Sequence, residues 1–124
     1  MKFLVMIYTD PSLMNGLSPG EFDSVMRGCL QHADELQSRG TLLESQQLAP
    51  PTTATSFRTR NGRTTVLDGP FAETKEFLAG FNLIEARDMD EALRIAQEFP
   101  WARFGAVEVR PVKDMGEVRR QVGL

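Results

Sequence analysis

His32 is the single histidine of the 124-residue chain, and its imidazole is the side chain best suited to proton transfer near neutral pH. It stands in a helical apolar pattern, one turn after Gly28 and Cys29, at the edge of the apolar stripe. An edge position lets the ring reach a cleft while its stem packs. The same position is equally typical of a boundary histidine without a role, so both interpretations stay open.

The run DGPFAETKE, residues 68–76, supplies the second candidate group, Asp68. Its carboxylate is of a type that orients a histidine or accepts a proton itself. The alternative is a turn residue whose carboxylate caps the backbone of Gly69 and Pro70. The sequence alone does not show whether His32 and Asp68 come within hydrogen-bonding distance. We carry both as candidate catalytic residues.

Other side chains of this run, and one strand residue, are candidates for contacting a substrate. Glu73 and Lys75 are interpreted either as cleft residues that hold a polar molecule or as part of a solvated, ion-paired face. Phe71 either lines a pocket or packs in the hydrophobic core, and we expect it to pack in the core. Tyr8 ends an apolar strand pattern and could offer its phenol to a ligand. The candidate substrate-binding residues are Tyr8, Gly69, Pro70, Phe71, Glu73 and Lys75.

Motifs for cofactors and metals are missing from the sequence. It contains no phosphate loop, dinucleotide fingerprint, nucleophile elbow or metal-ligand spacing, and one Cys with one His makes a closed zinc site unexpected. We therefore expect no cofactor. Proton transfer without a cofactor, as in a lyase or isomerase acting on a small polar organic molecule, is the chemistry that this residue set favours.

Composition predicts one soluble globular domain. The net charge of −3 argues against nucleic-acid binding, and the 41% hydrophobic and 25% charged residues are ordinary for a globular protein. The longest apolar run, residues 3–8, is too short to span a membrane. The lone Cys29 permits no internal disulfide, which favours a reducing, cytoplasmic location.

Periodicity predicts the elements that position these residues. Ser18, Pro19 and Glu21 form a capping-box signal at the start of a long helix. Asn61-Gly62 is a strong hairpin signal, and its register would place Asp68 opposite Thr55. The expected strands are residues 2–8, 41–47, the two arms of the hairpin, 80–86 and 104–110, and the expected helices are 19–39 and a second one capped by Asp88 and stopped by Pro100.

This order predicts an α+β, ferredoxin-like fold, in which two split βαβ units form an antiparallel sheet with an inserted β-hairpin. Both helices then lie on one face of the sheet. The strand at residues 2–8 is apolar on both sides, so Leu4 and Met6 would stay wet on the uncovered face. We therefore expect a homodimer of the dimeric α/β-barrel type, joined through the sheets or the hairpins.

The run at 68–76, with FLAGF after it, resembles the DGPF-domain, or YCII-related, family of small bacterial proteins. Further landmarks are the His32 helix followed by Gly40, the hairpin before Asp68, Asp90-Glu91-Ala92 and Glu108-Val109-Arg110-Pro111. The resemblance covers residues 1–113 as one domain and leaves 114–124 as a tail that forms a short helix or frays. It implies a ferredoxin-like fold, dimerisation and a cleft with a helix histidine and an aspartate. It also implies a link to extracytoplasmic-function sigma factors for some members.

Two functions remain open at this stage. The first is an enzyme in which His32 acts as general acid or base and Asp68 orients it or shares the proton. The second is a non-catalytic module of the same fold that senses a small ligand or binds a regulatory partner, with His32 incidental.

Overall fold

The computed structural model describes all 124 residues. A four-stranded antiparallel sheet in the order β2-β5-β1-β6 forms the body, and β3 and β4 form a separate two-stranded hairpin. The strands are β1 (Lys2–Thr9), β2 (Leu42–Gln47), β3 (Thr55–Arg60), β4 (Arg63–Asp68), β5 (Phe77–Glu85) and β6 (Gly105–Pro111). The helices are α1 (Pro11–Met14), α2 (Pro19–Ser38), α3 (Met89–Gln97) and α4 (Met115–Gln121), with the short 3-10 turns η1 (Pro51–Thr53) and η2 (Pro100–Phe104).

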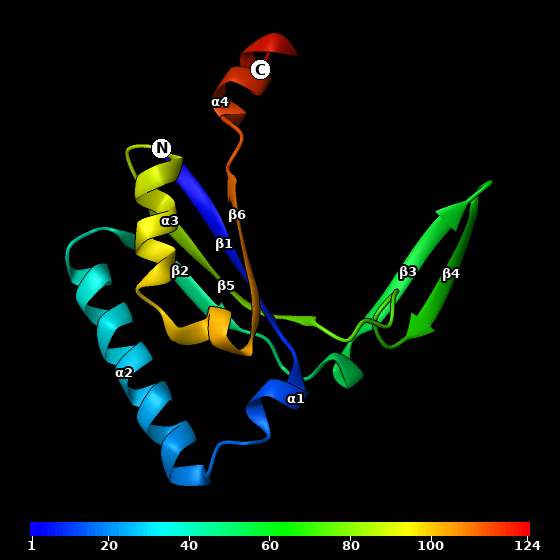
Figure 1. Ribbon diagram of the computed structural model, residues 1–124. Helices are drawn as coiled ribbons and strands as arrows, with labels where there is room; N and C mark the ends of the chain where they lie inside the picture. The colour runs from blue at the N-terminus through cyan, green and yellow to red at the C-terminus, as the bar shows by residue number, and fades with distance from the viewer.

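The helices α2 and α3 cover one face of the sheet, while the hairpin projects from the other side (Figure 1). Alternate residues of β1 enter the core on the helix side, because a strand points successive side chains to opposite faces. The central strand contributes Phe3 and Val5, and β5 contributes Ile84 beside them. Trp101, Phe104 and Ala92 close the core from η2 and α3.

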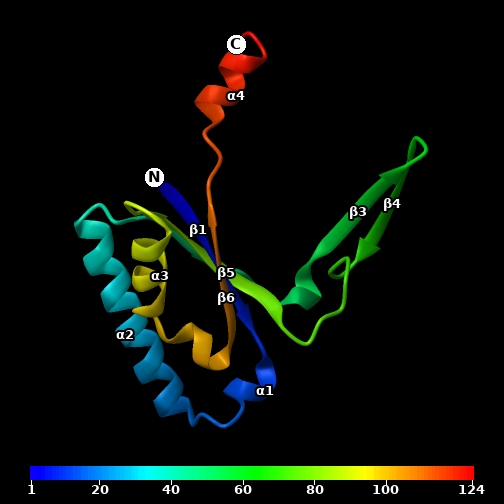
Figure 2. The same cartoon turned by 45° about the horizontal axis from the view of Figure 1, so that its top comes forward.

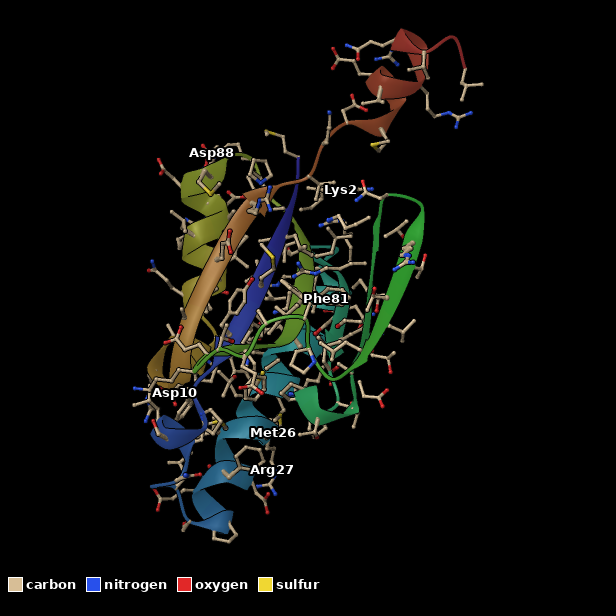
Figure 3. The ribbon with its side chains drawn as sticks, turned by 90° about the vertical axis from the view of Figure 1, so that its right-hand side faces the viewer. Lys2, Asp10, Met26, Arg27, Phe81 and Asp88 are labelled. Carbon is tan, nitrogen blue, oxygen red and sulfur yellow. The ribbon has the colours of Figure 1, made fainter.

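The opposite face of the sheet has no helix over it, and we call it the open face. Side chains at the paired positions Leu4–Leu83 and Met6–Phe81 share this face and are only partly buried. Figure 3 views the molecule from this side, with Phe81 near the middle of the sheet. The face therefore has an apolar centre that the protomer leaves uncovered, as the sequence predicted.

Local signals in the sequence account for most element boundaries. The Ser18 hydroxyl accepts a hydrogen bond from the Glu21 amide, and the Glu21 carboxylate accepts one from the Ser18 amide, so the predicted capping box starts α2. Asp88 caps α3 through the Glu91 amide. The hairpin register runs from Arg60 opposite Arg63 to Thr55 opposite Asp68, as the Asn61-Gly62 turn predicts.

The hairpin arm, β3 with β4, packs against little of its own chain. Phe57 is 72% exposed, and Val66 and Leu67 on β4 are exposed as well. A second view also shows the arm standing clear of the body (Figure 2). The helix α4 likewise stands away from the sheet at the far end of the chain.

Some elements differ from the sequence-based expectation. No element was expected between the strand at 2–8 and the helix at 19–39, but Asp10 caps the short helix α1 there through the Ser12 amide. The strand expected at 80–86 begins three residues earlier, at Phe77. Phe71 was expected in the core and is 70% exposed, because the loop that carries it lies at the base of the hairpin arm. Its ring instead lies 5.7 Å from the Arg58 guanidinium carbon.

The helices of the chain do not include one with both the length and the apolar character needed to cross a membrane.

Candidate functional site

A cavity of about 250 Å³ lies between α2 and the helix-covered face of the sheet, and we call it the helix-side cavity. The helix α2 forms its outer wall with Phe22, Met26, Cys29, Leu30 and Ala33. Ile7 and Thr9 of β1 form its floor. No charged side chain lines it, so the space is suited to an uncharged, largely apolar occupant.

Asn82 is the buried polar group of this cavity. It is 4% exposed and sits on β5 opposite Val5, among apolar side chains. Its Oδ1 accepts a hydrogen bond of 2.6 Å from the Ser45 hydroxyl. No protein group accepts from its amide nitrogen, which is not sealed off from the cavity. The amide nitrogen can therefore donate to whatever occupies the cavity, and Asn82 marks where a ligand's acceptor would sit.

Two further cavity residues, Trp101 and Cys29, have side chains whose properties bear on ligand binding and reactivity. Trp101, the only tryptophan of the chain, lines the cavity from η2. Cys29 faces it from α2, and burial raises the pKa of the Cys29 thiol, so this group stays protonated at neutral pH. The thiol is therefore a poor nucleophile here. The tryptophan is a natural reporter of whether the cavity is occupied.

A second, larger space lies at the base of the hairpin arm, and we call it the motif groove. Its volume is about 550 Å³. Three of the predicted substrate-binding residues line it, namely Tyr8, Pro70 and Phe71, and the acidic Glu76 adds a charge. The Tyr8 hydroxyl contacts only the Met6 sulfur, at 4.0 Å, and so keeps its hydrogen-bonding capacity for other groups. The structure thus brings part of the predicted set together in one place.

His32 lies outside both spaces. Its Nε2 is 2.8 Å from Glu98 Oε2 at the end of α3, and its Nδ1 is 3.8 Å from Glu35. The ring meets Phe99 edge-on, with 5.1 Å between centroids. Phe99 itself lines the helix-side cavity, so His32 stands behind that wall. Within the protomer the imidazole joins α2 to α3.

Asp68 ends β4 and is exposed at the base of the arm. No hydrogen bond or ion pair joins it to His32 in the protomer. The turn after it is held by other groups, because the Gly69 amide donates to Ala54 and the Ser56 hydroxyl donates to the Gly69 carbonyl. The Gly69 φ of 108° is one that side-chain-bearing residues rarely adopt.

Lys75 reaches a carboxylate that the sequence did not single out. Its Nζ is 3.5 Å from Asp10 Oδ2, and Asp10 is 5% exposed at the end of β1. The hydrogen bond from the Ser12 hydroxyl, with smaller help from Lys75, holds the pKa of Asp10 below its ordinary value. Lys75 therefore forms an ion pair between the motif loop and the end of β1, whereas Glu73 is exposed with no ion pair in the protomer.

Asn82, Asp10 and Glu98 were not predicted as site residues from the sequence. For Asn82 a signal was present, since a lone amide inside the apolar strand GFNLIEA falls on the same face as Ile84. Asp10 reads as an ordinary turn residue next to Pro11. Glu98 is separated from His32 by 66 positions, and no local pattern pairs them.

The family model for the YCII-related domain matches residues 1–116. The chain belongs to the YCII-related family. An uncharacterized protein of Rhizobium meliloti (strain 1021) is 40% identical over 114 residues, covering 90% of this chain and 92% of that protein. The residues matched by the family model include the cavity-lining residues, the motif run and the helices α2 and α3.

Among solved structures, the chain is similar to 5-chloro-2-hydroxyhydroquinone dehydrochlorinase from Burkholderia phenoliruptrix AC1100, in complex with 2,5-dihydroxybenzoquinone. The identity is 16%, the TM-score 0.46, and the match covers 91% of this chain and 94% of the other.

Proposed function

We propose that this YCII-related protein binds a small, uncharged and largely apolar organic molecule in the helix-side cavity. The observation that carries the proposal is the Asn82 amide, buried to 4% exposure with its NH₂ group unused by the protein. The expectation of a polar substrate changes here, because no charged residue lines this cavity. The ligand needs one hydrogen-bond acceptor, such as a carbonyl oxygen, at the Asn82 end.

A matched pair of probes tests this proposal. Acetophenone has a carbonyl acceptor, and ethylbenzene is a similar molecule that lacks it. Trp101 emission, measured during titration, reports binding because Trp101 lines the cavity. We expect acetophenone to bind more tightly than ethylbenzene, by roughly 10-fold, as for one buried hydrogen bond.

The variant Asn82→Leu should erase that preference while leaving ethylbenzene binding in place. Gln37→Leu, an exposed amide on α2, is the control and should keep the preference. If Asn82→Leu discriminated between the two probes as the unmodified protein does, Asn82 would not contact the ligand. If neither probe perturbed Trp101, the cavity would not be a binding site for this class.

A proton-transfer enzyme is the second candidate function, favoured by one contact. The 2.8 Å distance from Glu98 to His32 Nε2 is the arrangement by which a carboxylate orients an imidazole. Asp68 would have to approach His32 from the hairpin arm of another protomer, since nothing joins the two within one chain. Once a substrate is found, a folded His32→Gln protein with an unchanged kcat would end this candidate.

We also propose that the functional protein is a homodimer joined through the open faces. Glu108 and Arg110 stand on that face, opposite Met6 and Leu4, and neither forms an ion pair in the protomer. A two-fold axis between them would set each against its opposite charge on the second copy. The apolar centre of the face would be buried by the same contact.

Sedimentation velocity tests the assembly. We expect Leu83→Lys to give monomers, while Leu13→Lys on the exposed α1 keeps the dimer. Glu108→Arg and Arg110→Glu should each weaken the dimer, and the double variant should restore part of it. A compact monomer at micromolar concentration would refute the assembly.

The link to a sigma factor implied by the resemblance stays a prediction. Co-purification of a sigma factor with the tagged protein from its native host tests it, and recovery of the protein alone would count against it.

A further inference from the structure

The helix-side cavity and the motif groove share two wall residues. Leu48 and Phe77 line both spaces, and no other residue does. Leu48 follows β2 and Phe77 opens β5, so the two side chains stand where adjacent strands of the sheet meet. The Leu48 amide donates a 2.7 Å hydrogen bond to the Ala79 carbonyl, which fixes this junction.

The end of β1 alternates between the same two spaces. Thr9 faces the helix-side cavity and Tyr8 faces the motif groove, because successive strand residues point to opposite faces. The about 250 Å³ cavity and the about 550 Å³ groove therefore come close together at this end of β1, where Leu48 and Phe77 line both.

Phe77 is partly buried and lies opposite Thr9, another residue of the cavity wall. A ligand anchored at Asn82 and extending toward the motif loop would meet this aromatic ring. Leu48 is the other residue that lines both spaces. Both are apolar and carry no group that would hold a polar ligand, so their effect on a ligand is steric.

We propose that Phe77 and Leu48 form a partition that determines the length of ligand the protein accepts. This inference rests on the proposed function and deepens it. The preferred ligand is short enough to end at Phe77, with its acceptor at Asn82 and its apolar body under α2. Removal of the partition would join the two spaces and admit an elongated apolar chain that runs on into the motif groove.

A homologous series of methyl ketones, from butan-2-one to dodecan-2-one, measures this directly. Each has the carbonyl acceptor for Asn82, and Trp101 emission again reports binding. For the unmodified protein, affinity should rise about fourfold per added methylene and then stop rising at a definite chain length. In Phe77→Ala the rise should continue for several further methylenes before it stops.

Phe22→Ala is the matched control, because Phe22 lines the cavity at α2 but not the groove. It should lower the affinity of all ketones and leave the limiting chain length where it is. Leu48→Ala is the second opening variant, and it serves if Phe77→Ala does not fold. It should lengthen the limit as Phe77→Ala does.

The outcomes separate the two proposals. Absence of ketone binding to the unmodified protein would overturn the proposed function. Binding with the same limiting length in the unmodified protein and both opening variants would overturn the partition alone. The partition would also be overturned if the limiting chain length increased as much in Phe22→Ala as in Phe77→Ala, because total cavity volume would then determine the length of ligand accepted. An unmodified protein with no limit up to dodecan-2-one would do the same.

Discussion

The sheet body and the hairpin arm share the same antiparallel hydrogen bonding, but only the body has one face buried in a hydrophobic core. In the body, Phe3 and Ile84 are each 1% exposed across a β1–β5 pair. In the arm, the equivalent cross-strand pair Phe57–Val66 is exposed on both strands. The two regions thus separate what pairing contributes from what burial contributes.

Backbone pairing can define a register without giving much stability, since a two-stranded hairpin is marginal by itself in water. The arm keeps its register through the Asn61-Gly62 turn, whose φ values of 53° and 75° both lie in the left-handed region. The body keeps its register through the apolar face that would be exposed by a slip. A disturbance should therefore act globally in the body and locally in the arm.

The largest expected effect is that of Phe3→Ala, in the body. Removing this ring leaves a void in the best-buried part of the core and should lower the free energy of unfolding by about 3–5 kcal/mol. Chemical denaturation monitored by circular dichroism measures it. A loss below about 1 kcal/mol would mean that β1 is not the core strand.

In the arm, Gly62→Val places a β-branched residue at a φ of 75°. The strain should be about 1–2 kcal/mol and should open the hairpin locally. Amide hydrogen exchange at Arg58 and Thr65, a hydrogen-bonded pair of the hairpin, should accelerate, while the melting temperature of the body hardly changes. Equal acceleration across β1 would show that arm and body unfold as one unit.

Acid should act on the body through Asp10 and Asp88. The Ser12 hydroxyl lowers the pKa of Asp10, and the Glu91 amide lowers that of Asp88. Their stabilisation is complete above the unfolded-state pKa of 3.8 and is lost as the pH falls through their lower folded-state values. The melting temperature should decrease as the pH is lowered below 3.8, and the decrease should be less steep in Asp10→Asn than in the unmodified protein. An unaltered slope in this variant would exclude the Asp10 contribution.

The smallest effect on a dilute protomer is expected from Phe57→Ala. The ring is 72% exposed, so truncation should change stability by less than about 0.5 kcal/mol. A clear loss that grows with protein concentration would mean that the arm packs against a second copy. This measurement also bears on the proposed homodimer.

The fold was readable from the sequence where the signals are local. The Ser18 cap, the Asp88 cap and the Asn61-Gly62 turn act within a few residues, and the structure forms all three. The antiparallel sheet with both helices on one side followed from the order of these elements. The short helix at residues 11–14 was missed because four residues give too little periodicity to detect.

The candidate site was far less readable, because its contacts join distant segments. His32 meets Glu98, and Lys75 meets Asp10, across 66 and 65 positions of chain. Composition and motifs directed attention to the charged run at 68–76. The cavity instead depends on how far α2 stands from the sheet, a distance that no side-chain pattern encodes.

The uncharged lining of the helix-side cavity also bears on how fast a ligand is captured. An uncharged ligand experiences no net long-range attraction to the charges of the protein, so dissolved ions have little to screen. Entry would then depend on random diffusion. The association rate constant of the ligand should be nearly the same at low and at high ionic strength.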